Sequence, residues 1–258
     1  MPRERYIVRG LRALARRLPA LAFCLALAFA VLGVGEAVRQ RGEDEFVRRV
    51  TQDVLRDAQG ADTVSKAAAL RDYLRTHVRN INFYARTRPF LRDTAADTLR
   101  MGKGRCGEAT RAFVNMARAA GIPAQRLYLE GKKSHVVSVV SAEDGSSLIV
   151  DSADRPYFAD IEPLSELPSH VEFSSYSALG WRRLSALRKL PSNELSLGPL
   201  GYIFENPHAL LACLWLLASA STLALAAVLR RRFMRALPQN AVREFTVPAA
   251  LEDGSVEV

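Results

Sequence analysis

The sequence predicts an α+β domain that lies between two membrane-spanning helices. Two long apolar segments without charged residues stand near the ends of the chain, and each is long enough to span a membrane. Between them, helical patterns occupy the chain up to Gly121 and strand patterns follow from Ala124. Helices followed by a run of antiparallel strands are typical of α+β proteins, here with one helix packed on an antiparallel sheet.

The apolar segments cover residues 18–35 and 209–229, and neither contains a charged residue. At 1.5 Å per residue, each covers most or all of a hydrocarbon core of about 30 Å. We therefore predict transmembrane helices over residues 18–38 and 207–229, with the lipid bilayer as an expected partner. A cleaved signal peptide is the alternative for the first segment, because small residues precede Glu36, but the apolar run is long for that.

Arginines beside the spans predict their orientation. The tail of residues 1–17 carries 6 Arg and one Glu, and four Arg follow the second span between residues 230 and 235. Short segments rich in Lys and Arg stay on the cytoplasmic side of a membrane. We therefore expect a two-pass protein of the cytoplasmic (inner) membrane, with residues 1–17 and 230–258 in the cytoplasm and an extracytoplasmic domain over residues 39–206.

The charge between the spans gives little support to a nucleic-acid partner. Residues 36–206 carry 25 Lys and Arg against 22 Asp and Glu, a balance of +3 in a chain of net charge +9. The high isoelectric point therefore follows mainly from the arginines that flank the spans. We expect no nucleic acid to bind.

Apolar residues at helical spacing predict three helices early in this domain. Residues 43–59 form a helix that continues from the membrane span, and a second helix begins at an Asp62 cap and reaches about Val78. After a loop over residues 80–91, Asp93 is expected to cap a short helix that ends at Gly102.

The clearest helical pattern covers residues 107–120, and strands follow it. Gly121 and Pro123 end this helix, since glycine adopts the left-handed conformation and proline cannot continue a helix. The strands are predicted over residues 124–130, 135–141 and 146–151, and the last two are joined by a turn at Asp144-Gly145. Tyr176 to Leu190 is predicted to be a basic helix that either contacts the membrane surface or closes the domain.

Cys106 is the candidate nucleophile. Cys24 and Cys213 fall inside the spans, so Cys106 alone faces the outer compartment, without an intrachain disulfide partner there. It begins the strong helix, where the positive end of the helix dipole and unpaired backbone N–H groups favour a thiolate. A helix start behind a glycine-rich approach is therefore a favourable place for a reactive cysteine.

His135 and Asp151 are the candidate partners of this thiol. His135 opens one strand of the predicted hairpin and Asp151 closes the other. A five-residue loop over residues 141–145 places His135 opposite Asp151, whereas a four-residue loop pairs it with Ser152. Both versions bring the two ends together, and a carboxylate beside an imidazole holds its tautomer and stabilises its charged form.

These residues resemble the transglutaminase-like, or papain-like thiol, superfamily, in particular its bacterial membrane-anchored members. The resemblance rests on GRCGE at 104–108, RAAGIPA at 118–124, HVV at 135–137 and IVDS at 149–152. In this family the Cys opens a helix that ends in a Gly-Ile-Pro-Ala-Arg-like sequence, and the His and Asp lie on successive strands. The resemblance covers residues 94–160, the expected core of the domain. Gln125 stands where the family often has Arg, which here follows as Arg126, so the sub-family stays open.

The resemblance implies a papain/transglutaminase-like core and a Cys-His-Asp triad of Cys106, His135 and Asp151. The predicted reaction is acyl transfer on amide bonds of a peptide or protein outside the cytoplasm. Hydrolysis by a cysteine protease or amidase is favoured, because water is at hand in a solvent-facing site. A cross-linking transglutaminase is one alternative, and a non-catalytic transglutaminase-like module that binds a partner is another. The sequence identifies neither the substrate nor the oligomeric state.

No cofactor and no metal is expected. A zinc site is the other use of Cys, His and Asp, but the sequence has no Cys-x-x-Cys or His-x-x-x-His pair. The oxyanion hole is expected to use the Cys106 backbone N–H together with a donor from Asn80, Asn82 or Tyr84. The other three histidines are expected at the surface, in a loop and at the membrane interface: His77, His170 and His208.

Overall fold

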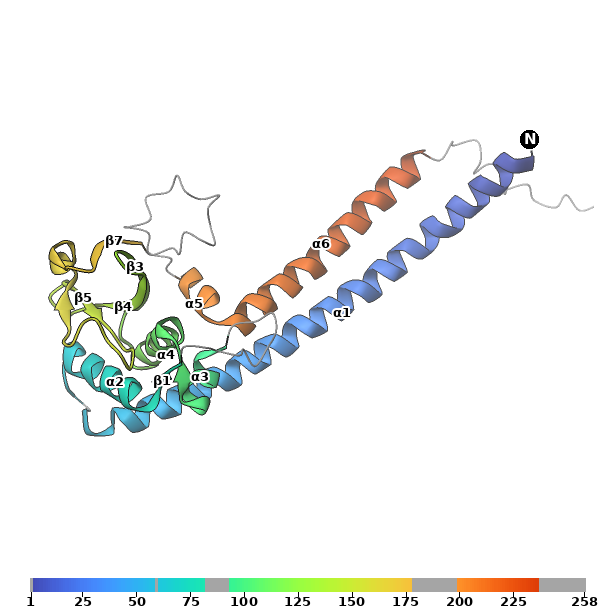
Figure 1. Cartoon of the computed structure of the whole chain (residues 1–258). Coiled ribbons are helices and arrows are strands. Elements are labelled where there is room, and N and C mark those ends of the chain that lie inside the picture. The colour runs from blue at the N-terminus through green and yellow to red at the C-terminus, as the bar shows by residue number, and fades with distance from the viewer. Residues whose placement is uncertain (1, 59, 82–92, 178–198, 237–258) are drawn as a thin grey trace, which may run out of the picture. The chain divides into compact units, whose positions relative to one another are not determined.

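The computed structural model describes residues 2–58, 60–81, 93–177 and 199–236 of the chain (Figure 1). The chain divides into two compact units, one formed by residues 1–33 with 213–258 and the other by residues 34–212. The second unit contains all three candidate site residues. It is a mixed helix and sheet structure, which confirms the predicted α+β class.

Two long helices, α1 (Pro2–Val54) and α6 (Pro207–Ala236), supply the first unit. Both contain a segment that is long and apolar enough to cross a membrane. Their apolar side chains, such as Leu32 and Leu217, are exposed rather than packed in a core. Within this unit the rings of Phe29 and Trp215 stack at a centroid distance of 5.5 Å.

The predicted helix starts and ends agree closely with the structure. Helix α1 runs without a break into the second unit, as predicted, and a short 3₁₀ turn follows at Arg56–Ala58. Helix α2 (Thr63–His77) begins at the Asp62 cap, whose side chain accepts from Ser65 N. Helix α6 begins at Pro207, directly after Asn206.

Helix α3 (Ala95–Met101) corrects one expected cap. Thr94, rather than Asp93, caps this helix, because the Thr94 hydroxyl accepts from Asp97 N at 3.0 Å. The Asp97 carboxylate in turn accepts from Thr94 N at 3.2 Å, so the two residues form a reciprocal capping box. A threonine followed three residues later by an acid is the stronger N-terminal signal.

Five antiparallel strands form the sheet, in the order β6-β5-β4-β3-β7. The three central strands were predicted: β3 (Ala124–Gly131), β4 (His135–Ser141) and β5 (Ser147–Val150). The edge strands β6 (Glu162–Pro163) and β7 (Phe173–Ser177) were not. The helix prediction that begins at Tyr176 is wrong at its start, since Tyr176 lies in β7, and residues 178–190 lie outside the described residues.

Two apolar clusters cover the two faces of the sheet. Helices α2 and α3 and helix α4 (Cys106–Ala119) pack against one face, where Val140 and Val150 contact the helical core. The opposite face is covered by the segment that follows β5 and by the 3₁₀ helix η2 (Leu164–Ser169). It buries Phe158, Leu167 and Phe173 among others, and each of these side chains is 1% exposed.

A short helix ahead of α6 is fixed to this unit by charge. Helix α5 (Pro199–Glu205) ends at Glu205, whose carboxylate pairs with Arg126 of β3 and lies 3.6 Å from Arg111 of α4. All three side chains are buried or nearly so.

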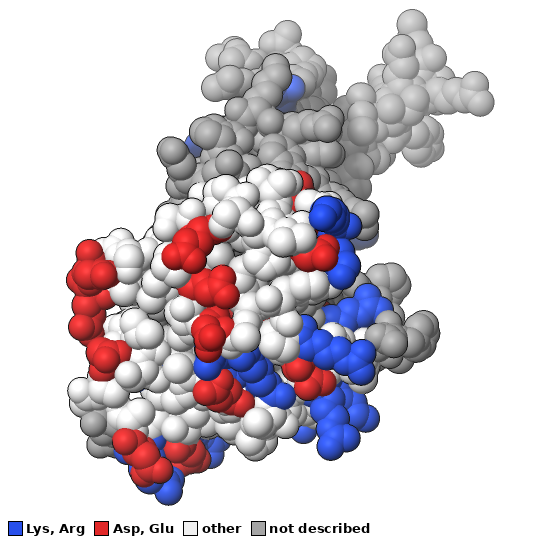
Figure 2. Space-filling model, turned by 60° about the vertical axis from the view of Figure 1, so that its left-hand side comes forward, with Lys and Arg blue, Asp and Glu red and all other residues white. Residues whose placement is uncertain are grey.

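Elsewhere the charged groups are mixed: Figure 2 shows basic and acidic side chains interspersed over the face in view, as the near balance of charge predicts.

Candidate active site

Cys106 is the first residue of α4, as the sequence predicts. The first turn is closed by Glu108, whose carboxylate accepts from Arg105 N at 3.2 Å. The thiol is partly exposed, so reagents and substrates can reach it. The thiol therefore lies at the positive end of the helix dipole. The backbone N–H groups beside it have no carbonyl one turn earlier in the helix to which they could donate.

The approach to Cys106 requires glycine at two positions. Gly102 has φ 60°, the left-handed conformation that ends α3, and a Cβ there would lie 2.9 Å from the His77 carbonyl. At Gly104 a Cβ would lie 2.9 Å from Glu108 Cβ. Between them, strand β2 (Lys103–Gly104) pairs in parallel with β1 (Arg79–Asn80) and so fixes the start of α4.

His135 and Asp151 meet across the β4–β5 hairpin. The distance from His135 Nε2 to Asp151 Oδ2 is 2.9 Å, and both side chains are buried. Neither predicted register is correct, because Ser138 pairs with Val150 and the loop covers residues 142–146. In that register Asp151 falls opposite Val137, two residues from His135. An offset of two keeps both side chains on one face of the sheet, at the diagonal distance that long side chains bridge.

Backbone N–H groups hold the Asp151 carboxylate in place. Its Oδ1 accepts from Ala153 N at 3.1 Å, and its Oδ2 accepts from Tyr157 N at 2.8 Å as well as contacting His135. The carboxylate is therefore oriented by the loop that follows it. With Nε2 of His135 on Asp151, Nδ1 is the ring nitrogen left to serve Cys106.

Helix α4 is tied to the strand that carries His135. The Thr110 hydroxyl, one turn after Cys106, donates to the Val136 carbonyl at 3.0 Å. Aromatic rings complete the surroundings of the imidazole: Tyr157 lies edge-on at a centroid distance of 4.9 Å, and Phe173 lies at 6.2 Å. These contacts restrict the imidazole ring to one orientation.

The electrostatics favour an ion pair between Cys106 and His135. Burial works against the thiolate, but a hydrogen bond with His135 and its positive charge lower the pKa of Cys106 below its ordinary value. Burial also opposes the charged imidazole, yet hydrogen bonds to Asp151 and Cys106 raise the pKa of His135 to about 9. Both pKa shifts therefore favour the thiolate–imidazolium pair over the neutral pair.

The oxyanion-hole candidates are only partly described. Asn80 lies on β1 opposite Gly104, two residues ahead of Cys106, so it is near the thiol along the paired strands. Its backbone N–H donates to Asp154 at 3.2 Å. Asn82 and Tyr84 lie outside the described residues. Among the described residues, no group of three or more His, Cys, Asp or Glu side chains is arranged to hold a metal ion.

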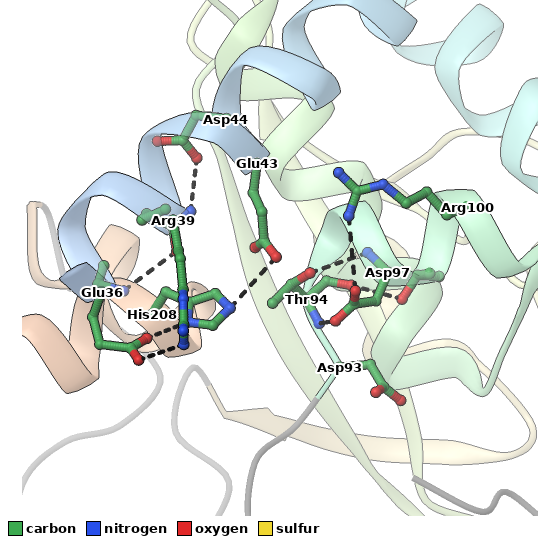
Figure 3. Close-up of polar contacts among 12 residues, drawn as sticks. Glu36, Arg39, Glu43, Asp44, Asp93, Thr94, Asp97, Arg100 and His208 are labelled. Atoms are coloured by element: carbon green, nitrogen blue, oxygen red, sulfur yellow. Dashed lines mark hydrogen bonds and ion pairs between the residues drawn. The ribbon is translucent and has the colours of Figure 1, made fainter. Parts of the chain in front are cut away.

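The other three histidines lie away from the thiol. His77 is exposed and stacks on Tyr73, while His170 packs against Phe158 and Phe173. His208 is 3% exposed, and its two ring nitrogens face the carboxylates of Glu36 and Glu43 (Figure 3). The sequence predicted only that His208 lies at the membrane interface. In the structure it is buried between two carboxylates.

Arg75 is a residue near the site that the sequence did not indicate. Its guanidinium donates to three backbone carbonyls in the segment that begins at Asp151 and ends at Ala159. The contacts join residues 76 to 84 positions apart and involve no partner side chain. An arginine on a helix therefore carries no sequence signal for such a role.

Comparison with known proteins adds a family to this geometry. The model of the transglutaminase-like superfamily matches residues 48–145, which include Cys106 and His135 and end before Asp151. Nothing among the curated proteins matches the chain.

Three solved structures were also compared, and the chain covers less than half the length of each. A candidate cysteine protease from Cytophaga hutchinsonii is 18% identical with a TM-score of 0.38, over 47% of this chain and 41% of that one. A candidate protease from Parabacteroides distasonis is 16% identical with a TM-score of 0.33, over 49% and 26%. A TGase is 20% identical with a TM-score of 0.33, over 43% and 31%.

The family match covers helix α2, the start of the Cys106 helix and the strand of His135. Of the elements that the resemblance singled out, the match includes the Cys106 helix and the strand of His135, whereas the Asp151 motif lies beyond its end. The family model therefore assigns residues 48–145 to the transglutaminase-like superfamily.

Proposed function

We propose that this chain is a membrane-anchored thiol enzyme that hydrolyses amide bonds in peptides or proteins. In this proposal Cys106 is the nucleophile, His135 is its acid and base, and Asp151 orients His135. The observation that carries the proposal is the buried 2.9 Å contact between His135 and Asp151 beside a partly exposed thiol at a helix start. The lowered pKa of Cys106 supports it.

The first step forms an acyl-enzyme. The Cys106 thiolate attacks the carbonyl carbon of the substrate amide, and the carbonyl oxygen gains negative charge that the backbone N–H of Cys106 stabilises. When the C–N bond breaks, the imidazolium of His135 gives its proton to the leaving amine. A thioester on Cys106 and a neutral His135 remain.

The second step resolves the thioester with water. Neutral His135 takes a proton from water, and the resulting hydroxide attacks the thioester carbonyl. The C–S bond breaks, the acid product leaves, and the thiolate and imidazolium are restored. An amine in place of water would give a cross-linked product, which is the transglutaminase alternative.

The test is incubation of the full chain with glutaminyl peptides, with and without a labelled primary amine. We expect the glutamine side chain to release ammonia, and we expect no incorporation of the labelled amine. Cys106→Ala should abolish this release, whereas Cys213→Ala, a matched change in the second apolar helix, should keep it. Incorporation of the labelled amine well above hydrolysis would instead favour the cross-linking activity.

The non-catalytic alternative has its own test. A binding module needs no activated thiol, so Cys106 would then react with alkylating reagents only near its ordinary pKa. We expect iodoacetamide to modify Cys106 at mildly acidic pH, with the labelled peptide identified by mass spectrometry. Failure to react there would favour the binding module over the enzyme.

The proposal also includes the topology predicted from the arginines. Residues 39–206 would lie outside the cytoplasm and both tails inside, so the substrate would be an extracytoplasmic peptide or protein. A membrane-impermeant maleimide applied to cells with a permeabilised outer layer should label Cys106 and leave Cys24 and Cys213 unlabelled. Labelling of Cys106 only after lysis of the inner membrane would move the substrate to the cytoplasm.

A further inference from the structure

The segment of residues 151–159 contacts His135 in two ways. Its first residue supplies the carboxylate that bonds His135 Nε2, and Tyr157 supplies the ring that lies edge-on against the imidazole. The segment also bonds to itself, since the backbone N–H groups of Ala153 and Tyr157 donate to the Asp151 carboxylate. The orientation of His135 therefore depends on the conformation of this segment.

Arg75 holds both ends of the segment. In the last turn of α2, its Nε donates to the Asp151 carbonyl at 2.9 Å. One terminal nitrogen donates to the Phe158 carbonyl at 2.6 Å, and the other donates to the Ala159 carbonyl at 2.8 Å. A single planar guanidinium thus joins the start and the end of the loop to the helix that packs on the other side of β5.

The chemistry of these contacts is specific to arginine. Guanidinium presents N–H donors in a fixed fork, so it can satisfy three carbonyls that lie around one plane. A lysine ammonium at the same place keeps the charge but is a compact donor on a flexible stem, and it cannot span both ends of the segment. Hydrogen bonds from a charged donor are also shorter and stronger than neutral ones.

We infer that Arg75 is a positioning residue for the proposed active site, which closes the 151–159 segment and thereby aims the Asp151 carboxylate and the Tyr157 ring at His135. The inference rests on the proposed function of Cys106, His135 and Asp151. Arg75 contacts neither the thiol nor His135 among the described residues, so it acts only through this segment.

The inference predicts a change in the charge state of the thiol. If Asp151 is no longer aimed at His135, the imidazolium loses its main stabilising partner and the pKa of His135 falls. The Cys106 thiolate then loses its ion partner, and its pKa rises. In acid the fraction of thiolate falls, whereas at high pH the thiol is ionised in either case.

The experiment measures iodoacetamide alkylation of Cys106 in the full chain between about pH 5 and pH 9, with the modified peptide resolved by mass spectrometry. In Arg75→Gln we expect the rate near pH 5 to fall about tenfold relative to the rate near pH 9, since one pKa unit is a tenfold change. Arg75→Lys should give an intermediate profile.

Arg71→Gln is the matched control, because Arg71 lies one turn earlier on α2 and its Nε bonds the neighbouring Asp72. It should keep the wild-type profile. An Arg75→Gln profile equal to that of the wild type and of Arg71→Gln would overturn the inference. If Arg75→Gln does not fold, the profile of Arg75→Lys decides in the same way.

Amide hydrogen exchange separates this inference from the proposed function. The peptide that contains the Ala153 and Tyr157 amides should exchange about tenfold faster in Arg75→Gln than in the wild type or Arg71→Gln. Unchanged exchange would overturn the inference. If wild-type Cys106 itself does not react in acid, the proposed function fails, and the exchange measurement still decides whether Arg75 closes the segment.

Discussion

His135 and His208 are both buried histidines beside carboxylates, yet their surroundings differ in one partner. His135 has Asp151 on one ring nitrogen and interacts through its ring with the Cys106 thiol. His208 has a carboxylate on each ring nitrogen, Glu36 on one side and Glu43 on the other (Figure 3). A carboxylate that charges an imidazole is therefore not enough to make a site. The nucleophile decides which histidine has chemistry to perform.

Removal of the nucleophile should have the largest effect, because His135 would then have no thiol beside it, as His208 has none. In Cys106→Ala we expect amide hydrolysis to fall on the order of 10⁴-fold or more, since members of a catalytic triad act as a unit. The measurement is kcat/KM on a peptide that the wild type cleaves. Residual cleavage within tenfold of the wild type would show that another group is the nucleophile.

The two carboxylates that contact the histidines should differ next. Asp151→Asn removes the charge that stabilises imidazolium His135, and we expect kcat to fall about 10²- to 10⁴-fold. Glu36→Gln makes the same chemical change beside His208 and should leave kcat within about twofold, because no reacting group is there. Equal losses in the two variants would contradict the assignment of one site as catalytic and the other as structural.

The pH dependence separates the two charges of the thiolate–imidazolium pair. The pKa of His135 is about 9, so above that pH it loses the proton that the leaving amine needs. Amide hydrolysis should then fall about tenfold per pH unit, while iodoacetamide alkylation, which needs only the thiolate, should stay level. As pH falls, both rates should decrease together as Cys106 is protonated. Measuring both from about pH 5 to pH 11 checks this, and a common fall above pH 9 would contradict it.

The smallest effect on activity is expected at His208 itself. In His208→Gln the carboxylates of Glu36 and Glu43 lose the imidazole between them, which should lower the stability of the fold by about 3 kcal/mol. The midpoint of thermal unfolding in detergent should fall, while the pH profile of Cys106 alkylation should not move. A shift of that profile would mean that the two histidines are coupled.

The sequence predicted the parts of the site that local chemistry defines. The start of α4 at Cys106 follows from the glycines before it and the apolar spacing after it, and β4 begins at His135 as predicted. The register of the hairpin differs from the two predicted versions by two residues and by one residue, because the loop covers residues 142–146. Within this loop Ser146 N donates to the Asp144 carboxylate, and such a side-chain contact leaves no periodic signal.

The remaining parts depend on contacts between distant residues. The sequence analysis missed β7 because Tyr176 begins a basic stretch whose apolar residues have helical spacing. In the structure Tyr176 pairs with Leu129 of β3, and a pairing between such distant residues leaves no local signal. The pairing of Glu205 with Arg126 joins residues 79 positions apart, and nothing near either residue indicates it. Residue type alone does not say which buried charges will meet.

The sheet also protects its own edges, with a consequence for how the domain behaves as it folds. On one side β7 pairs with the edge of β3, and the register of this pairing shifts between Glu130 and Gly131. On the other side the edge strand β6 has only two residues, one of them Pro163, which has no N–H to offer a further strand. A chain cut before Phe173 would leave the backbone groups of residues 128–131 in β3 without a strand partner and would remove Phe173 from the apolar cluster. We expect such truncated chains to aggregate, so β7, the last strand among the described residues, protects the sheet against misassembly.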